Sequence, residues 1–194
     1  SPLYFDELQR QKTDQQMPNA WGGWFNAGDF DRTIESLEPA GLLMFAFEMN
    51  PHAFNDGDLN IPESGNGIPD ILDEVKFQID FFLRLKGPTG GISGGLDTSG
   101  DVYSYASYND IQKEWYQFAE DPLSTYWAAA AAAQLGYCFK IIGKTLLADS
   151  YIEEAEKLYS WAEKNTPNTI PNVKILVGHT FEDIRAQASV WLYR

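Results

Sequence analysis

The sequence is poor in the residues that build disulfides and metal sites. Its 194 residues include one cysteine and two histidines. A disulfide needs two cysteines, so Cys138 forms none within the chain, and its place in the apolar run 135–142 predicts a buried thiol. His52 and His179 are far apart and have no cysteine or further histidine nearby, which argues against a zinc site. No apolar stretch reaches the roughly 20 residues that a membrane-spanning helix needs.

Basic residues are also scarce. Fourteen Lys and Arg residues stand against 28 Asp and Glu, which gives a net charge of −14. Nucleic acids and anionic membrane surfaces both repel an excess of carboxylates, so the sequence argues against either as a partner. A neutral ligand such as a sugar remains compatible with this charge. Aromatic residues make up 14% of the chain, and their faces can fill a core or stack on sugar rings.

Hydrophobic periodicity predicts an all-α domain. Helices are expected over 39–49, from 69 to about 86, from 122 through the alanine run 128–133, over 147–164 and from 181 to the end. The apolar segment 42–47 predicts a helix buried on every side. The alanine run lets a second backbone come close, which places its helix at an inner position. Since no C-cap signal precedes Arg194, we expect the chain to be part of a larger domain.

Two segments carry possible chemistry. The first, Trp21 to Arg32, places two carboxylates and two tryptophans around three glycines. A carboxylate on a rigid loop beside an aromatic ring suits sugar hydrolysis, in which a base takes a proton from the attacking water. The alternative is a Gly-Asp turn whose side chain caps the backbone. In the second, Ile61 to Glu74, the acids Glu63, Asp73 and Glu74 are either catalytic or, as we expect, solvated or capping.

Together the two segments resemble glycoside hydrolase family 9, the inverting cellulase-type enzymes. The family pattern Gly-Gly-Trp-(His/Tyr)-Asp-Ala-Gly-Asp-(Phe/Tyr) is similar to Gly22 to Phe30, and Glu63 to Glu74 match the second family pattern at every position. Gly90 to Ile92 and residues 122–125 are weaker similarities. The resemblance implies part of an (α/α)6 barrel of six helical hairpins. The chain 1–194 would form about its first half, with no second domain.

The resemblance also implies residue roles. Asp29 corresponds to the general base that activates water, and Asn26 stands where the family usually has a second Asp that holds this water. Asn can hydrogen-bond the water but cannot carry charge. The family's general acid lies beyond the matched part, and inversion needs both carboxyl groups. We therefore expect the chain alone to be inactive, and the remaining half of its catalytic domain to be its partner.

The long segment 88–120 is rich in Gly, Ser and Tyr, and we expect a functional loop. In similar enzymes this region lines the substrate cleft with aromatic residues, so Trp115 and Tyr116 are our candidates for sugar contacts, with packing under the loop as the alternative. Trp24 is a third candidate, although support of the Asp29 loop is the expected role.

No cofactor is required, and no metal site is assigned. Some relatives bind calcium near the last predicted helix, where Glu182 and Asp183 lie here, but the flanking residues depart from that pattern. Asp56, Asp58 and Asn60 alternate as oxygen ligands but lack the Gly and terminal Glu of an EF-hand. A solvated loop is expected at both places, so a structural calcium ion cannot be assigned.

These patterns predict a secreted hydrolase of β-1,4-linked glucan or related oligosaccharides, acting outside the cytoplasm. Three alternatives stay open. Asn26 is compatible with a sugar-binding homologue that has lost catalysis, and an exo-acting relative of the glucosaminidase type would share the same motifs. Paired helices also build protein-binding scaffolds, but no internal repeat is visible.

Overall fold

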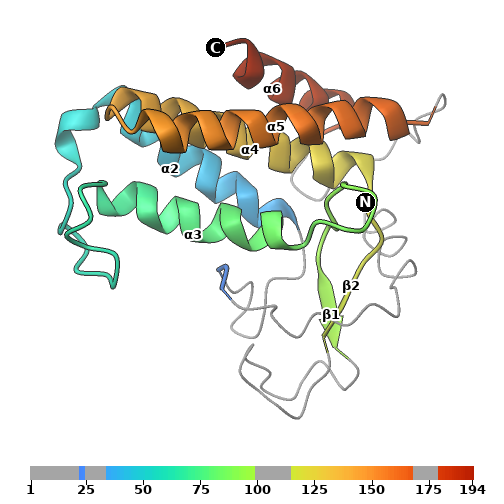
Figure 1. The fold of residues 1–194 in the computed structure, drawn as a ribbon, viewed down its shortest axis with the longest axis horizontal. Coiled ribbons are helices and arrows are strands. Elements are labelled where there is room, and N and C mark those ends of the chain that lie inside the picture. The colour runs from blue at the N-terminus through green and yellow to red at the C-terminus, as the bar shows by residue number, and fades with distance from the viewer. Residues whose placement is uncertain (1–21, 25–33, 99–114, 168–178) are drawn as a thin grey trace.

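The computed structural model describes residues 22–24, 34–98, 115–167 and 179–194. Five α-helices make up most of it: α2 (Leu37–Met49), α3 (Asp70–Arg84), α4 (Pro122–Ile141), α5 (Thr145–Asn165) and α6 (Phe181–Tyr193). Short 3-10 turns, η1 (Ile34–Ser36) and η2 (Pro51–Ala53), lie before and after α2. Each predicted helix is present, so the all-α fold class is confirmed (Figure 1).

Helix α4 is the centre of the bundle. It contacts each of the other four helices, and its alanine run 128–133 is buried throughout. The backbones of α4 and α5 come close at Gly136, where an added Cβ would lie 2.7 Å from Ile152 Cγ1. The predicted inner position of this helix is therefore confirmed. Asp121 caps the start of α4 by accepting a hydrogen bond from the Ser124 N–H at 2.8 Å.

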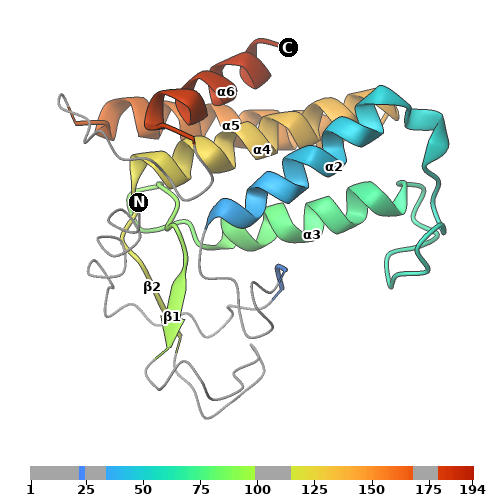
Figure 2. The same cartoon turned by 180° about the vertical axis from the view of Figure 1, so that it is seen from behind.

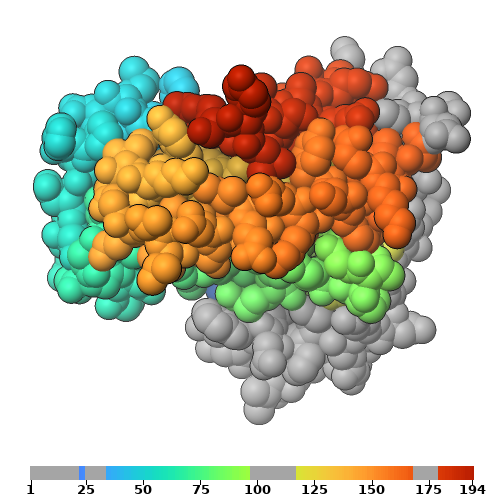
Figure 3. Space-filling view, turned by 45° about the horizontal axis from the view of Figure 1, so that its top comes forward, coloured from blue at the N-terminus to red at the C-terminus, as the bar shows by residue number. Residues whose placement is uncertain are grey.

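The helices alternate in direction. Figures 1 and 2 show that α2, α4 and α6 all begin near the same end of the bundle, whereas α3 and α5 run back the other way. In the space-filling view α5 and α6 lie next to one another and cover much of the face shown (Figure 3). This arrangement is that of successive helical hairpins. Within the described ranges, no helix combines the length and the apolar character that crossing a membrane requires.

The prediction that α2 is buried on every side is wrong. Leu37, Ala40, Met44 and Phe47 are buried against the bundle, but Leu42, Phe45 and Met49 are more than half exposed. Helices α3 and α4 cover one side of α2. The sequence could not reveal this, because an all-apolar helix does not indicate which of its sides lacks a neighbour.

Part of the predicted long loop forms a two-stranded antiparallel ribbon. Strand β1 (Leu96–Thr98) pairs with β2 (Trp115–Gln117), with Leu96 opposite Gln117 and Thr98 opposite Trp115. Figure 1 shows the ribbon projecting from the end of the bundle at which α4 begins. The turn 87–91 before it is held by Glu120, whose carboxylate accepts hydrogen bonds from the Thr89 and Gly91 N–H groups at 3.1 and 2.8 Å.

Candidate active site

The predicted base, Asp29, and its neighbour Asn26 lie outside the described residues. The structure does describe both ends of the segment that carries them. Gly22, Gly23 and Trp24 precede it, and η1 follows it directly. These two ends determine how the segment is attached to the bundle.

Gly22 and Gly23 lie flat against α3. Both have a positive φ, +86° and +77°, a conformation that side-chain-bearing residues seldom adopt. A Cβ on Gly23 would lie 2.7 Å from Cγ of Phe81, and one on Gly22 would lie 2.8 Å from Nη2 of Arg84. The two glycines thus meet a conformational and a steric requirement at once.

Trp24 is bound to the same helix through two hydrogen bonds. Its backbone N–H donates to Oε1 of Gln78 at 2.5 Å, and its indole Nε1–H donates to Oε2 of Glu74 at 3.2 Å. Glu74, one of the acids of the second segment, therefore holds the first segment in place. These contacts support the structural role expected for Trp24, whereas a sugar contact remains a prediction.

The far end of the segment is also attached. Ile34 is fully buried, and its backbone N–H donates to the Gly94 carbonyl oxygen at 2.9 Å, just before β1. The Ser36 hydroxyl accepts a hydrogen bond from Nε2 of Gln78 at 2.8 Å. Trp24 and η1, which precede and follow the segment 25–33, are therefore both attached to the bundle, and Gln78 contacts each of them.

The second segment forms a folded loop around Asp70. This buried carboxylate accepts hydrogen bonds from the Gly57 and Leu59 N–H groups at 2.8 and 2.7 Å and from the Ser64 hydroxyl at 2.8 Å. Burial alone would raise the pKa of Asp70, but these hydrogen bonds outweigh it and hold the pKa below its usual value. Asp70 is therefore an ionised centre around which the loop folds.

The other acids of this segment also have structural contacts. Asp73 is buried and accepts two hydrogen bonds from Nδ2 of Asn66, at 3.0 and 3.1 Å. Burial is the main cause of its raised pKa, and the Asn66 hydrogen bonds oppose it. Glu63 is exposed. The loop lies at the end of the bundle opposite the ribbon (Figure 2). The exposed Glu63 agrees with the solvated role expected for it, whereas Asp73 is buried and bound to Asn66 and so is not solvated.

The two places considered for calcium are held by hydrogen bonds. Asp56 accepts from the Gly65 and Gly67 N–H groups at 2.5 and 2.6 Å. Asp183 forms a capping box with Thr180 at the start of α6. Over residues 22–24, 34–98, 115–167 and 179–194, no three His, Cys, Asp or Glu side chains are grouped so that they could hold a metal ion.

Trp115 and Tyr116 lie side by side in β2, opposite Thr98 and Asp97 of β1. Their backbones belong to the ribbon, and their side chains fall outside what the structure describes. Cys138 is buried as predicted, and its burial raises the pKa of the thiol above its usual value.

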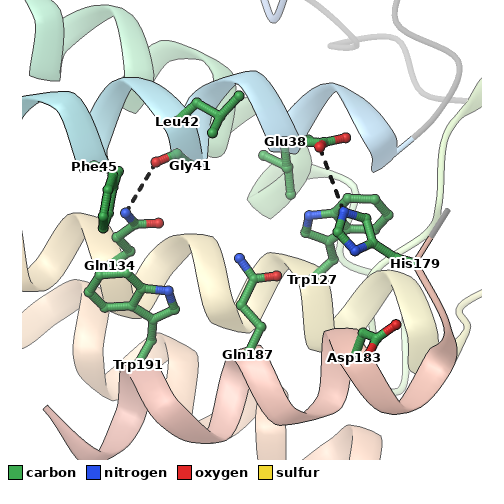
Figure 4. Close-up of a pocket in the computed structure, with 11 residues that line it drawn as sticks. Glu38, Gly41, Leu42, Phe45, Trp127, Gln134, His179, Asp183, Gln187 and Trp191 are labelled. Carbon is green, nitrogen blue, oxygen red and sulfur yellow. Dashed lines mark hydrogen bonds and ion pairs between the residues drawn. The ribbon is translucent and has the colours of Figure 1, made fainter. Parts of the chain in front are cut away.

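A groove runs along the bundle between α2, α4 and α6 (Figure 4). Its volume is about 370 Å³. At the end where these helices begin, His179 Nε2 lies 3.6 Å from Glu38 Oε1 and the His179 ring meets the edge of Trp127. Further along, Nε2 of Gln134 donates to the Gly41 carbonyl oxygen at 3.2 Å. Sequence reasoning missed this groove, because its residues come from three separate helices.

Sequence reasoning also missed Gln78. The signal was present, because a glutamine three residues after Val75 falls on the mainly apolar, buried side of an amphipathic helix. Its partners are Trp24 and Ser36, which are 54 and 42 residues away in sequence, so the pattern could not name them.

Known proteins with a similar sequence belong to one enzyme family. The profile of glycosyl hydrolase family 9 matches residues 5–194. A xyloglucan-specific endo-β-1,4-glucanase of Bacteroides ovatus is 30% identical over 158 residues, which are 79% of this chain and 27% of that protein. Endoglucanase D of Acetivibrio thermocellus is 24% identical over 87% of this chain and 27% of its own length.

Solved structures agree with the sequence relatives. A metagenome-derived family 9 endoglucanase superimposes with a TM-score of 0.71 at 28% identity, over 88% of this chain and 32% of that one. A family 9 protein of Bacteroides ovatus gives the same TM-score at 27% identity, over 34% of its length. This chain thus spans about a third of the length of the relatives it matches, and part of their barrel. It belongs to glycosyl hydrolase family 9.

Proposed function

We propose that this chain contributes the general base to the catalytic domain of a hydrolase of β-1,4-linked glucan. Membership of family 9 and the names of its relatives, an endo-β-1,4-glucanase and an endoglucanase, support the substrate class. The observation that carries the residue assignment is the attachment of Gly22 to Trp24 to α3, because it fixes the backbone five residues before Asp29.

The proposed reaction inverts the anomeric centre. Asp29 takes a proton from a water molecule while that water attacks the anomeric carbon, and an acid on the opposite side protonates the departing glycosidic oxygen. The two carboxyl groups of inverting enzymes are roughly 6.5–9.5 Å apart, which leaves room for the water. We assign the acid to no residue of this chain and place it in the rest of the catalytic domain.

The rest of the domain also has a place to bind. Leu42, Phe45 and Met49 of α2 and Val190 and Tyr193 of α6 are more than half exposed and lie on the two helices that border the groove. Large apolar side chains exposed on neighbouring helices are compatible with an interaction site. Because the solved relatives are about three times as long as this chain, we propose that their additional helices have counterparts that cover this face.

The ribbon is the proposed place of substrate contact. Trp115 and Tyr116 are adjacent in β2, at the end of the bundle where α2, α4 and α6 begin (Figure 1). Aromatic faces stack on the C–H faces of sugar rings. We propose that the enzyme acts outside the cytoplasm, because a β-1,4-glucan polymer supplied from outside cannot cross a membrane before it is cut.

Replacing Asp29 tests the base. In the complete catalytic domain, Asp29→Asn keeps the side-chain shape but removes the proton acceptor, so we expect kcat on soluble β-1,4-glucan to fall roughly 10²–10⁴-fold, the usual contribution of acid–base catalysis. Asp31→Asn in the same segment is the matched control and should change kcat less than about threefold. Near-normal turnover in the Asp29 variant would refute the assignment.

Asn26 supports a second candidate, a sugar-binding homologue without catalysis. Titration calorimetry with cello-oligosaccharides separates the two functions, because binding without release of shorter products favours this candidate. The variant Asn26→Asp adds the carboxylate that the family usually has there. Hydrolysis that begins only in this variant would establish the binding function for the natural chain.

A further inference from the structure

We infer that Gln78 is a positioning residue, which holds together the two ends of the segment 25–33 and thereby places Asp29. The inference rests on the proposed function in one respect, that Asp29 is the base. The structural part concerns Gln78, Trp24 and Ser36 alone.

The amide of Gln78 uses its acceptor on one end of the segment and its donor on the other. Oε1 accepts the Trp24 backbone N–H at 2.5 Å, and Nε2 donates to the Ser36 hydroxyl at 2.8 Å. A primary amide offers both a donor and an acceptor from one planar group, so a single side chain links Trp24 and Ser36. We call this pair of hydrogen bonds the Gln78 bridge.

Burial makes the bridge strong. Gln78 has no exposed surface, and a buried polar group that loses its partner lowers the free energy of unfolding more than an exposed one does. Each hydrogen bond of the bridge therefore resists opening more than a surface bond would. Both ends have further attachments beside the bridge, through the Trp24 indole to Glu74 and through the Ile34 N–H to Gly94.

Packing alone does not explain a glutamine at this position. The buried side of α3 is otherwise built mainly from apolar residues, among them Leu72, Val75, Ile79 and Phe82. A leucine would fill a similar volume without polar atoms to satisfy. What the amide adds is the link between Trp24 and Ser36. Holding the two ends of a short segment at a fixed separation removes part of its conformational freedom.

The variant Gln78→Leu tests the bridge in the complete catalytic domain. Leucine keeps a similar volume and removes both hydrogen bonds of the Gln78 bridge. We expect kcat to fall about 10–100-fold with KM changed less than about threefold, because placement of the base affects the chemical step. Amide hydrogen exchange in peptides that contain residues 25–33 should speed up by at least about tenfold.

Gln134→Leu is the matched control. Gln134 is also a buried helical glutamine, 3% exposed, and its Nε2 binds the Gly41 carbonyl oxygen and Glu48, away from this segment. Gln134→Leu should lower the free energy of unfolding about as much as Gln78→Leu does. Amide exchange over 25–33 should be no faster in it than in wild type. Equal exchange rates over 25–33 in wild type and Gln78→Leu, or equal acceleration in both variants, would overturn the inference.

Two further variants keep the test decisive. If Gln78→Leu does not fold, Ser36→Ala removes one hydrogen bond of the bridge, and the same changes should appear at smaller size. In Gln78→Glu a protonated carboxyl restores one donor and one acceptor, so its kcat relative to wild type should approach one at low pH; a ratio that stays well below one at every pH contradicts the bridge. If Asp29→Asn remains active, the proposed function fails, but the exchange result for Gln78→Leu still decides whether the bridge exists. Faster exchange with unchanged kcat in Gln78→Leu refutes the positioning of Asp29.

Discussion

Glycine is required at Gly23 for two separate reasons. Its φ of +77° is unfavourable for other residues, and a Cβ would contact the Phe81 ring at 2.7 Å. Gly143 shares only the first of these, since its φ is +72° but no atom lies within 4 Å of its added Cβ. Comparing substitutions at Gly23 and Gly143 therefore separates backbone strain from steric overlap.

We expect Gly23→Ala to lower the free energy of unfolding by about 2–5 kcal/mol, the sum of left-handed strain and overpacking. Gly143→Ala should lose only the strain, about 1–2 kcal/mol. Urea denaturation of both variants measures the difference. Equal losses of free energy of unfolding in the two variants would mean that the Phe81 ring moves aside at no cost. Gly22 to Trp24 would then not be held against α3 as described.

Asp70 gives a prediction about pH. Its folded pKa is depressed, so its contribution to stability is present above the unfolded value of about 3.9 and is lost as the pH falls through the folded pKa. The stability gap between wild type and Asp70→Asn should therefore be largest near neutral pH and narrow below about pH 4. Thermal melts across pH 2–7 measure it.

Asp58→Asn is the control for this experiment. Asp58 accepts a hydrogen bond from the Asn55 N–H at 2.6 Å, but the side chain is exposed and belongs to the same loop. Its variant should shift the melting temperature less than Asp70→Asn does at neutral pH. A gap for Asp70→Asn that stays constant with pH would contradict the ionised, hydrogen-bonded carboxylate.

At the residue scale, the sequence was sufficient to find the segments but not their contacts. The motif residues Glu63 to Glu74 could be read directly, and their solvated or capping character was expected. What could not be read was that Glu74 binds Trp24, because a hydrogen bond across 50 residues depends on how the chain folds between them. The base itself remains a prediction.

At the scale of elements, the helices were predictable and the ribbon was not. Regular apolar spacing and the Asp121-Pro122 start indicated α3 and α4 within a few residues. Strands β1 and β2 have three residues each and pair across a long interval, so neither shows an alternating pattern. Short strands of this kind are defined by their partner and not by their own sequence.

The close packing of α4 on α5 is testable through a pair of helical glycines. Replacing a mid-helix glycine by alanine ordinarily stabilises a helix by about 1 kcal/mol. At Gly136 the new Cβ would lie 2.7 Å from Ile152 Cγ1 and 3.0 Å from the Ala148 carbonyl oxygen, so we expect Gly136→Ala to destabilise instead, by up to about 2 kcal/mol.

Gly41 in α2 is the matched case, because its added Cβ would lie 3.5 Å from the nearest atom, Oε1 of Gln134. Gly41→Ala should raise the free energy of unfolding by as much as about 1 kcal/mol. Chemical denaturation of the two variants should thus give opposite signs. A stabilising effect of both alanines would show that α4 and α5 are less closely packed than the structure indicates.

At the scale of the whole molecule, the exposed apolar residues of α2 and α6 form the face on which we propose that the rest of the catalytic domain packs. Leu42 and Phe45 are 65% and 54% exposed here. In the isolated chain, Leu42→Glu with Phe45→Glu should reduce binding of a hydrophobic dye and self-association. In the complete domain the same pair should lower the melting temperature, because two charges would then be buried.

Leu146→Glu provides the control for this face. Leu146 is 88% exposed near the start of α5, away from the groove. Its variant should change neither dye binding nor the melting temperature appreciably. If the paired substitution leaves the complete domain as stable as wild type, the rest of the domain does not cover α2.

The isolated chain should release no sugar from β-1,4-glucan, since a base without its acid cannot complete the inverting reaction. A reducing-sugar assay over a long incubation checks this, with the complete catalytic domain as the positive control. Measurable hydrolysis by residues 1–194 alone would mean that both carboxyl groups lie within them.

The most direct test of the whole account is the configuration of the first product. The complete catalytic domain should be mixed with a soluble β-1,4-glucan in an NMR tube, and the anomeric proton signals followed from the first minutes, before mutarotation. A water activated by Asp29 attacks in a single displacement, so the account predicts that the α-anomer appears first. Initial accumulation of the β-anomer would contradict it, because retention requires a carboxylate that attacks the sugar itself.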